Sequence, residues 1–161
     1  MTEAGPEKPS DALVEQYKLY VEMADRTSAR RVDTNKFYVT LLTGLLALIA
    51  LAFEKEWFAN IQDPTLIVAS AIGLLLCIVW GINIRSYKQL NSGKFKVIHD
   101  IEKQLPFQCY ECEWDLLGQG KDKKLYYPLS HVEGWVPVAI GIPYGILLIY
   151  TAARMVLPLI P

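Results

Sequence analysis

The chain has 161 residues, of which 52% are apolar and 20% are charged, and its formal net charge is −1. A nearly neutral balance supplies no field that would attract nucleic acid, so we expect no nucleic-acid partner. Soluble domains typically carry about 25% charged residues spread along the chain, whereas the charges here cluster and leave three long uncharged segments. The composition therefore favours an integral membrane protein.

The first 36 residues are polar and charged, without the apolar core of a secretory signal. We expect the first apolar segment to remain as an uncleaved anchor. Residues 1–10 should be disordered. Residues 11–36 should form a helix, because neither Gly nor Pro falls between Ser10 and Thr43, and Ser10 or Asp11 can cap the start of a helix.

Three uncharged segments are long enough to cross a membrane, at residues 37–53, 66–84 and 135–153. A bilayer core of about 30 Å needs roughly 17–25 helical residues. Since hydrocarbon cannot satisfy backbone N–H and C=O groups, each span should be a helix. We predict an all-α integral membrane protein whose third transmembrane helix extends to residue 157, followed by a tail at 158–161. A buried helical hairpin in a soluble protein is the alternative.

Two prolines make the third span the least regular. Pro137 falls in the first turn, where a missing backbone donor has little effect, but Pro143 lies in the interior and should kink the helix. A re-entrant hairpin that turns at Pro143 is the alternative, and it would return the C-terminus to the side from which the segment enters.

The positions of Lys and Arg predict the orientation. The N-terminal segment carries six of these residues and the connection 85–134 carries eight, whereas the external loop 54–65 has only Lys55. Because basic loops stay in the cytoplasm, we expect the N-terminus and the connection 85–134 to be cytoplasmic and the protein to lie in a bacterial inner membrane. Indole rings favour the headgroup zone, and three lie near span ends: Trp57, Trp80 and Trp135.

The first two spans should continue as cytoplasmic helices over residues 11–36 and 85–105. Apolar residues recur there at spacings of three and four, which is typical of an amphipathic helix. The two stripes are Leu13, Tyr17, Tyr20, Val21 and Ala24, and Leu90, Val97, Ile98, Ile101 and Leu105. We predict that these extensions pair as a cytoplasmic helical hairpin. The same stripes could also form a subunit interface.

Residues 106–134 contain turn signals at residues 118–120 and 127–128. We expect a small loop-rich cytoplasmic cap with room for one short β-hairpin. The sequence Gly-Gln-Gly-Lys at 118–121 lacks the spacing of a phosphate-binding loop, so we interpret it as a charged turn.

One pattern in the cap could carry chemistry, a Cys-x-x-Cys at Cys109 and Cys112. Zinc usually needs four N or S ligands, and only His131 and His99 could complete the set. We expect ordinary reduced cysteines. A metal site at Cys109, Cys112 and His131 and a redox pair are the alternatives. His131 and Glu133 could form an acid–base pair, but no motif adds a nucleophile, so we expect no catalytic residue and no cofactor.

Small residues in the spans could support close helix packing. Gly141 and Gly145 form a GxxxG, and Ala69 and Gly73 form a similar pair. We interpret these four positions as helix or oligomer contacts, together with part of the cytoplasmic stripes: Leu13, Tyr17, Val21, Val97 and Ile101.

Several stretches resemble the RipA family of octameric bacterial membrane proteins, chiefly YVEMADR at 20–26 and LNSGKFKVI at 90–98. Further family-like positions are Arg30, Arg31, Asn35, Glu113, Trp114, His131 and Glu133. The resemblance extends from about residue 17 to residue 137. It implies a homo-octamer of the cytoplasmic membrane, tied in some bacteria to envelope integrity and growth inside host cells, without enzymatic activity. The Cys-x-x-Cys is not part of the family pattern.

The sequence favours a non-enzymatic scaffold embedded in lipid, whose oligomer presents its caps to an unidentified cytoplasmic or envelope protein. A passive channel or transporter formed by the oligomer is the alternative, although the spans hold none of the ionisable residues that transport sites usually use. An enzyme acting in the cap is a third hypothesis.

Overall fold

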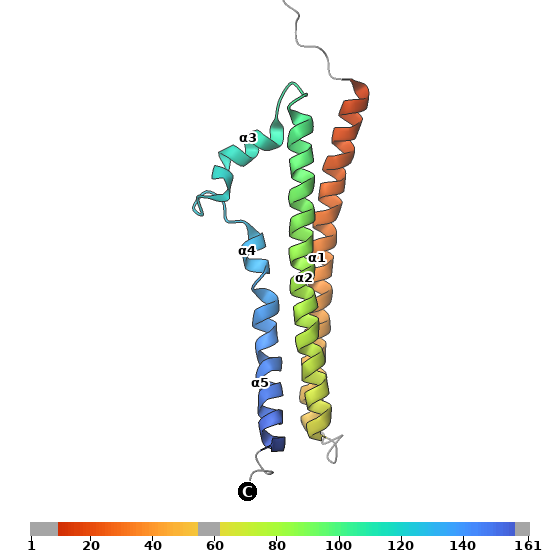
Figure 1. Ribbon diagram of the computed structural model, residues 1–161, viewed down its shortest axis with the longest axis vertical. Helices are drawn as coiled ribbons and strands as arrows, with labels where there is room; N and C mark the ends of the chain where they lie inside the picture. The colour runs from red at the N-terminus through yellow and green to blue at the C-terminus, as the bar shows by residue number, and fades with distance from the viewer. Residues whose placement is uncertain (1–9, 55–61, 157–161) are drawn as a thin grey trace, which may run out of the picture. The chain divides into compact units, whose positions relative to one another are not determined.

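The computed structural model describes residues 10–54 and 62–156, apart from the side chains of Phe53, Gln62, Ser130 and His131. These residues contain helices and no strand (Figure 1). The elements are α1 (Asp11–Glu54), α2 (Gln62–Glu102), α3 (Cys109–Leu116), the 3-10 helix η1 (Gly118–Gly120), α4 (Leu129–Glu133) and α5 (Val136–Val156). The prediction of an all-α protein is confirmed.

Three helices are long and apolar enough to cross a membrane, as the uncharged segments predict. By length and composition these candidate spans lie within Asp11–Ala52, Asp63–Glu102 and Val136–Val156. α5 has 21 residues, which at 1.5 Å per residue gives about 32 Å, close to the thickness of a bilayer core. α5 continues through Pro143, so the re-entrant turn considered for the third span is not observed.

Some segments differ from their predicted boundaries. α1 ends at Glu54 and α2 begins at Gln62, so both ends of the predicted loop 54–65 are helical. Pro64 fits in the first turn of α2 because N–H groups there have no intrahelical acceptor. The predicted cap contains α3, η1 and α4 and, among its described residues, no β-hairpin. The predicted disordered N-terminus (except Ser10), most of the external loop and the C-terminal tail lie outside the described residues.

The chain divides into two compact units. Unit 1 contains residues 1–31 and 86–130, and unit 2 contains residues 32–85 and 131–161. α1 and α2 contribute to both units, α3 and η1 belong to unit 1, and α5 belongs to unit 2. The division in α2 falls beside residue 84, where the second span is predicted to end.

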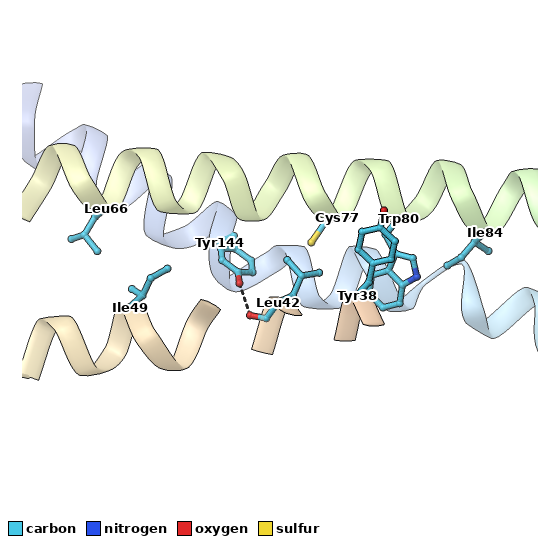
Figure 2. Packing of buried hydrophobic residues seen from close by; sticks show 8 residues of the cluster. All are labelled: Tyr38, Leu42, Ile49, Leu66, Cys77, Trp80, Ile84 and Tyr144. Atoms are coloured by element: carbon cyan, nitrogen blue, oxygen red, sulfur yellow. Dashed lines mark hydrogen bonds between the residues drawn. The ribbon is translucent and has the colours of Figure 1, made fainter. Parts of the chain in front are cut away.

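The core of unit 2 is formed by side chains of α1, α2 and α5 (Figure 2). Its buried residues are Tyr38, Leu42, Ile49, Leu66, Cys77, Trp80, Ile84 and Tyr144. Other faces of the same helices expose large apolar side chains, for example Leu48, Ile78 and Ile149 at 60%, 61% and 72%. Such a surface suits helices surrounded by hydrocarbon rather than water.

In unit 1 the extensions of α1 and α2 pair as the predicted helical hairpin. The Tyr17 hydroxyl of α1 donates a hydrogen bond to Glu102 of α2, and Ala24 is buried, at 4% exposure. The predicted stripe of α2 is not buried as a single face, because Ile98 is 0% exposed whereas Leu90 is 52% exposed.

Candidate functional site

The most unusual side chain of unit 1 is Glu102, the last residue of α2, which is 0% exposed. Burying a carboxylate is strongly unfavourable unless hydrogen-bond donors surround it. The Tyr17 hydroxyl and the Tyr110 backbone N–H donate to Oε1 at 2.8 and 3.0 Å. The Glu111 N–H donates to Oε2 at 3.3 Å. One carboxylate therefore joins α1, α2 and α3.

Glu102 also supplies the cap that α3 lacks. α3 begins at Cys109, and its N-cap residue Gln108 makes no side-chain capping hydrogen bond. The first N–H groups of a helix have no intrahelical acceptor, and negative charge is favoured at that end. Both Glu102 oxygens accept from this first turn, so the end of α2 determines where α3 begins.

Aromatic contacts support the same junction. The Phe95 ring of α2 lies edge-on to Tyr110 of α3, with ring centroids 5.6 Å apart. Burial, together with the hydrogen bond to Glu102 and its charge, raises the pKa of Tyr17 well above its ordinary value. The Tyr17 phenol therefore stays protonated even at alkaline pH and remains a donor to the carboxylate.

In unit 2 a second group of polar contacts joins α1 to α2. Trp80 Nε1 donates to Asn35 Oδ1 at 2.8 Å, and Asn83 Nδ2 donates to the Tyr38 hydroxyl at 3.0 Å. The Tyr38 and Trp80 rings stack with centroids 5.7 Å apart. Packing and interhelical hydrogen bonds drive helix association in lipid, so these four residues fix the register of α1 against α2.

The location of Trp80 corrects a prediction. Its side chain is 1% exposed, so this indole packs inside the helix bundle instead of facing the headgroup zone. Trp135 is 72% exposed and remains available to that zone, and Trp57 lies outside the described residues. All faces of a membrane helix can be apolar, so proximity to a span end did not reveal which indole turns inward.

Tyr144 is the residue through which α5 enters the core of unit 2. It is 0% exposed, and its hydroxyl donates to the Leu42 carbonyl at 2.6 Å (Figure 2). The ring lies directly over Gly73 of α2, where an added Cβ would overlap the ring atoms. Gly73 is therefore needed for contact between two helices of the same chain.

The other predicted small-residue contacts differ in how they are used. A Cβ at Gly141 would lie 3.7 Å from Cys77, an ordinary packing distance, whereas one at Gly145 would meet nothing within 4 Å. Ala69 is partly buried against the core. Gly73 and Gly141 therefore pack α2 against α5, and Gly145 is the member of the two pairs that leaves open space.

The Cys-x-x-Cys has no metal-binding arrangement in the described part of the chain. Cys109 and Cys112 are exposed free thiols on α3, and no group of three or more described His, Cys, Asp or Glu side chains could hold a metal ion. The His131 side chain lies outside the description. Its role in a metal site, or in an acid–base pair with Glu133, stays a prediction.

Of the family-like positions, Asn35 and Trp114 have the clearest contacts. Asn35 accepts the Trp80 hydrogen bond. Trp114 lies against η1, whose residues 118–120 have φ angles of 64°, 54° and 68°. A Cβ at Gly120 would come within 3.2 Å of the Trp114 indole, so position 120 favours glycine both for its positive φ and for lack of space. Three further positions lie on helix surfaces: Arg30 and Glu113 are exposed and Arg31 is half-buried.

Sequence reasoning did not identify Glu102 or the packing role of Tyr144. A signal for Glu102 exists, because it lies four residues after Ile98 and three before Leu105. This spacing places a carboxylate on the apolar stripe of α2, where it needs buried donors. For Tyr144 the matching signal, a large residue opposite Gly73, appears only once α2 and α5 are paired.

We expect Tyr144→Phe to lower the free energy of unfolding by about 1 kcal/mol, in the range measured for hydrogen bonds between membrane helices. The ring stays in place, so only the bond to the Leu42 carbonyl is lost. Denaturant unfolding in mixed micelles measures this change. Tyr150→Phe is the matched control, because Tyr150 is on the same helix and 59% exposed. Equal losses for both variants would contradict the assigned role.

A comparison with known families yields one match. The model of the octameric membrane protein family (8xMP) matches residues 14–153. This range covers α2, α3 and α4 completely and most of α1 and α5. The contacts of Glu102 and of Tyr144 therefore both fall inside it. No significant match is found among curated proteins or among solved structures.

Proposed function

The chain belongs to the octameric membrane protein family, and from this premise we propose that it forms a homo-octamer that acts as a non-enzymatic scaffold in a bacterial inner membrane. The membrane location has the support of the family and of three long apolar helices. The family description supports self-association. From the resemblance to the RipA family we further propose a role in envelope integrity or adaptation to a host.

The observation that carries this proposal is the uncovered apolar surface of unit 1. Leu19 and Met23 of α1 are 54% and 40% exposed, and Leu90 and Val97 of α2 are 52% and 38% exposed. These residues lie outside the predicted spans, where lipid tails would not cover them. Apolar surface exposed to water commonly marks a protein contact, and further copies of the chain would bury it.

Native mass spectrometry of the protein in mild detergent and in nanodiscs tests the stoichiometry. We expect a particle with eight times the mass of one chain. Leu90→Lys with Val97→Lys should shift the particle to smaller assemblies, because both changes place a charge on the proposed contact. Gln104→Lys, at an exposed position of unit 1, is the control. A monomer at every protein concentration would contradict the assembly.

The scaffold role requires a protein partner, which cross-linking in intact cells followed by purification would recover. The comparison variant is Leu116→Lys, since Leu116 of α3 is 76% exposed and its change should leave the fold intact. We expect at least one protein that is recovered with the natural chain and lost with this variant. Identical recovery from both chains would contradict a partner at the cap.

The proposed orientation places the N-terminus and unit 1 in the cytoplasm. Cys109 and Cys112 are exposed thiols of unit 1, whereas Cys77 is buried in unit 2. A membrane-impermeant maleimide should therefore label inverted membrane vesicles and leave intact spheroplasts unlabelled. Cys109→Ser with Cys112→Ser is the control, and it should abolish the signal in vesicles. Labelling of intact spheroplasts at these two residues would reverse the orientation.

A passive channel remains the second candidate because Thr40, Thr43 and Tyr150, three polar residues of the spans, are exposed. The Thr43 hydroxyl bonds to a carbonyl of its own helix, and four further polar residues also form hydrogen bonds within the chain: Ser70, Asn83, Tyr144 and Thr151. Little polar surface is then left to line a water-filled path. We expect proteoliposomes to stay impermeable to K⁺ and Cl⁻. Ion flux that Thr40→Val reduces would favour the channel instead.

A further inference from the structure

Residues 121–129 of unit 1 combine free positive charge with exposed apolar and aromatic side chains. This basic-aromatic segment contains Lys121, Lys123 and Lys124, all exposed. No ion pair between these lysines and another described residue is found. Its large side chains are also exposed: Leu125 64%, Tyr126 39%, Tyr127 47% and Leu129 69%.

The one acidic residue of the segment does not neutralise the lysines. Asp122 Oδ1 accepts the backbone N–H of Lys124 at 2.9 Å, and the Asp122 carbonyl accepts from Leu125 and Tyr126 at 3.1 Å. Asp122 therefore builds the local turn. The Lys123 ammonium lies 5.8 Å from the centre of the Tyr127 ring. A cation and an aromatic ring are therefore close neighbours on this segment.

The segment is followed closely along the chain by a membrane span. Leu129 opens α4, α4 ends at Glu133, and α5 begins at Val136. At 1.5 Å per helical residue and at most about 3.6 Å per extended residue, chain length keeps Leu129 within about 17 Å of the start of α5. The headgroup layer is roughly 5–8 Å thick on each side of the bilayer core, so the chain length allows Leu129, the last residue of the segment, to lie at this layer.

We infer that the basic-aromatic segment docks onto anionic phospholipid headgroups beside the third span. Leucine side chains enter the upper acyl layer, tyrosine rings lie at the headgroup level, and lysine stems extend so that their ammonium groups meet phosphate oxygens. A second copy of the chain would need acidic groups opposite three lysines as well as an apolar surface. An anionic leaflet offers negatively charged phosphates and an apolar acyl layer side by side.

Each lysine near an anionic surface strengthens association about fivefold, so three lysines together contribute roughly a hundredfold. This attraction is screened over a Debye length of about 8 Å at physiological salt. Docking should therefore depend on lipid charge and on ionic strength. It does not depend on the subunit count, so the proposal does not rest on the octamer.

The test places an environment-sensitive fluorophore on Leu125→Cys in full-length protein that lacks its native cysteines. The protein is reconstituted in nanodiscs of phosphatidylcholine alone or with phosphatidylglycerol, each with a trace of lipid carrying a quencher in the headgroup. We expect quenching several-fold stronger in the anionic nanodiscs, and a marked loss of it at high salt. The same fluorophore on Gln16→Cys, an exposed position of unit 1, should be quenched little in either lipid.

Lys121→Gln, Lys123→Gln and Lys124→Gln combined should remove the dependence on lipid charge while native mass spectrometry shows an unchanged assembly. Because all three side chains are exposed, the fold should be retained. The loss of quenching at high salt, measured with the lysines in place, tests the same attraction without any substitution of them. Quenching that is equally weak in both lipids would overturn the inference. So would a fluorophore that is shielded equally in both lipids and not quenched, since that result indicates coverage by another copy of the chain.

Discussion

Gly73→Ala should destabilise the packing of α5 against α2. The added Cβ would overlap the Tyr144 ring. That ring is 0% exposed and its hydroxyl is held by the Leu42 carbonyl, so it has no open space into which to move. Adding a methyl group to a well-packed core typically destabilises a protein by about 1–3 kcal/mol, and we expect the upper part of this range.

Gly81→Ala is the matched control because Gly81 lies on the same helix and a Cβ there would meet nothing within 4 Å. We expect this control to be neutral or slightly stabilising, since alanine favours a helix more than glycine does. Unfolding in mixed micelles measures both variants. Adding Tyr144→Leu to Gly73→Ala should recover part of the loss by removing the ring. If both glycine variants had the same stability, Tyr144 would not require Gly73.

The same pair of variants separates two uses of the small residues. A glycine that served only contacts between subunits would, when changed to alanine, alter the particle mass and leave the unfolding of a single chain unchanged. For Gly73→Ala we expect the unfolding of a single chain to change first, because the packing of α5 is lost, and the particle mass to change less. If another subunit covers the open side of Gly145, Gly145→Ala should alter the particle mass and leave the unfolding of a single chain unchanged.

The long helices could be predicted from the sequence because their determinants are local. Three segments without charge are long enough to span a bilayer, and the absence of Gly and Pro between Ser10 and Thr43 allows a single helix there. The end of α1 and the start of α2 were harder to predict from the sequence. The predicted loop extended to residue 65, but α2 begins at Gln62 and its first turn tolerates Pro64.

The short helices of the cap could not be predicted because their determinants are distant in the sequence. α3 has eight residues and no capping side chain of its own, which is too short for stability in isolation. Its first turn is held by Glu102, eight and nine residues earlier. Likewise, the small-residue pairs predicted close packing but could not distinguish contact within a chain from contact between chains.

Glu102→Ala should loosen unit 1 and leave unit 2 folded. The change removes the acceptor for the Tyr17 hydroxyl and for the N–H groups of Tyr110 and Glu111. A buried donor left without an acceptor destabilises a protein by about 1–3 kcal/mol. These donors are part-buried, so we expect a loss of about 1–3 kcal/mol in the local stability of α3. Hydrogen exchange should show this as lost protection of the α3 amides.

Two further variants make this test specific. Glu113→Ala removes an exposed carboxylate from α3 and should leave exchange unchanged. Tyr17→Phe removes one donor and leaves the carboxylate with its two backbone donors, so its effect should be about 1 kcal/mol. Protection of α5 amides reports on unit 2 and should not change in any variant. Equal protection of α3 in the natural chain and in Glu102→Ala would mean that α3 is held by its aromatic contact with Phe95 alone.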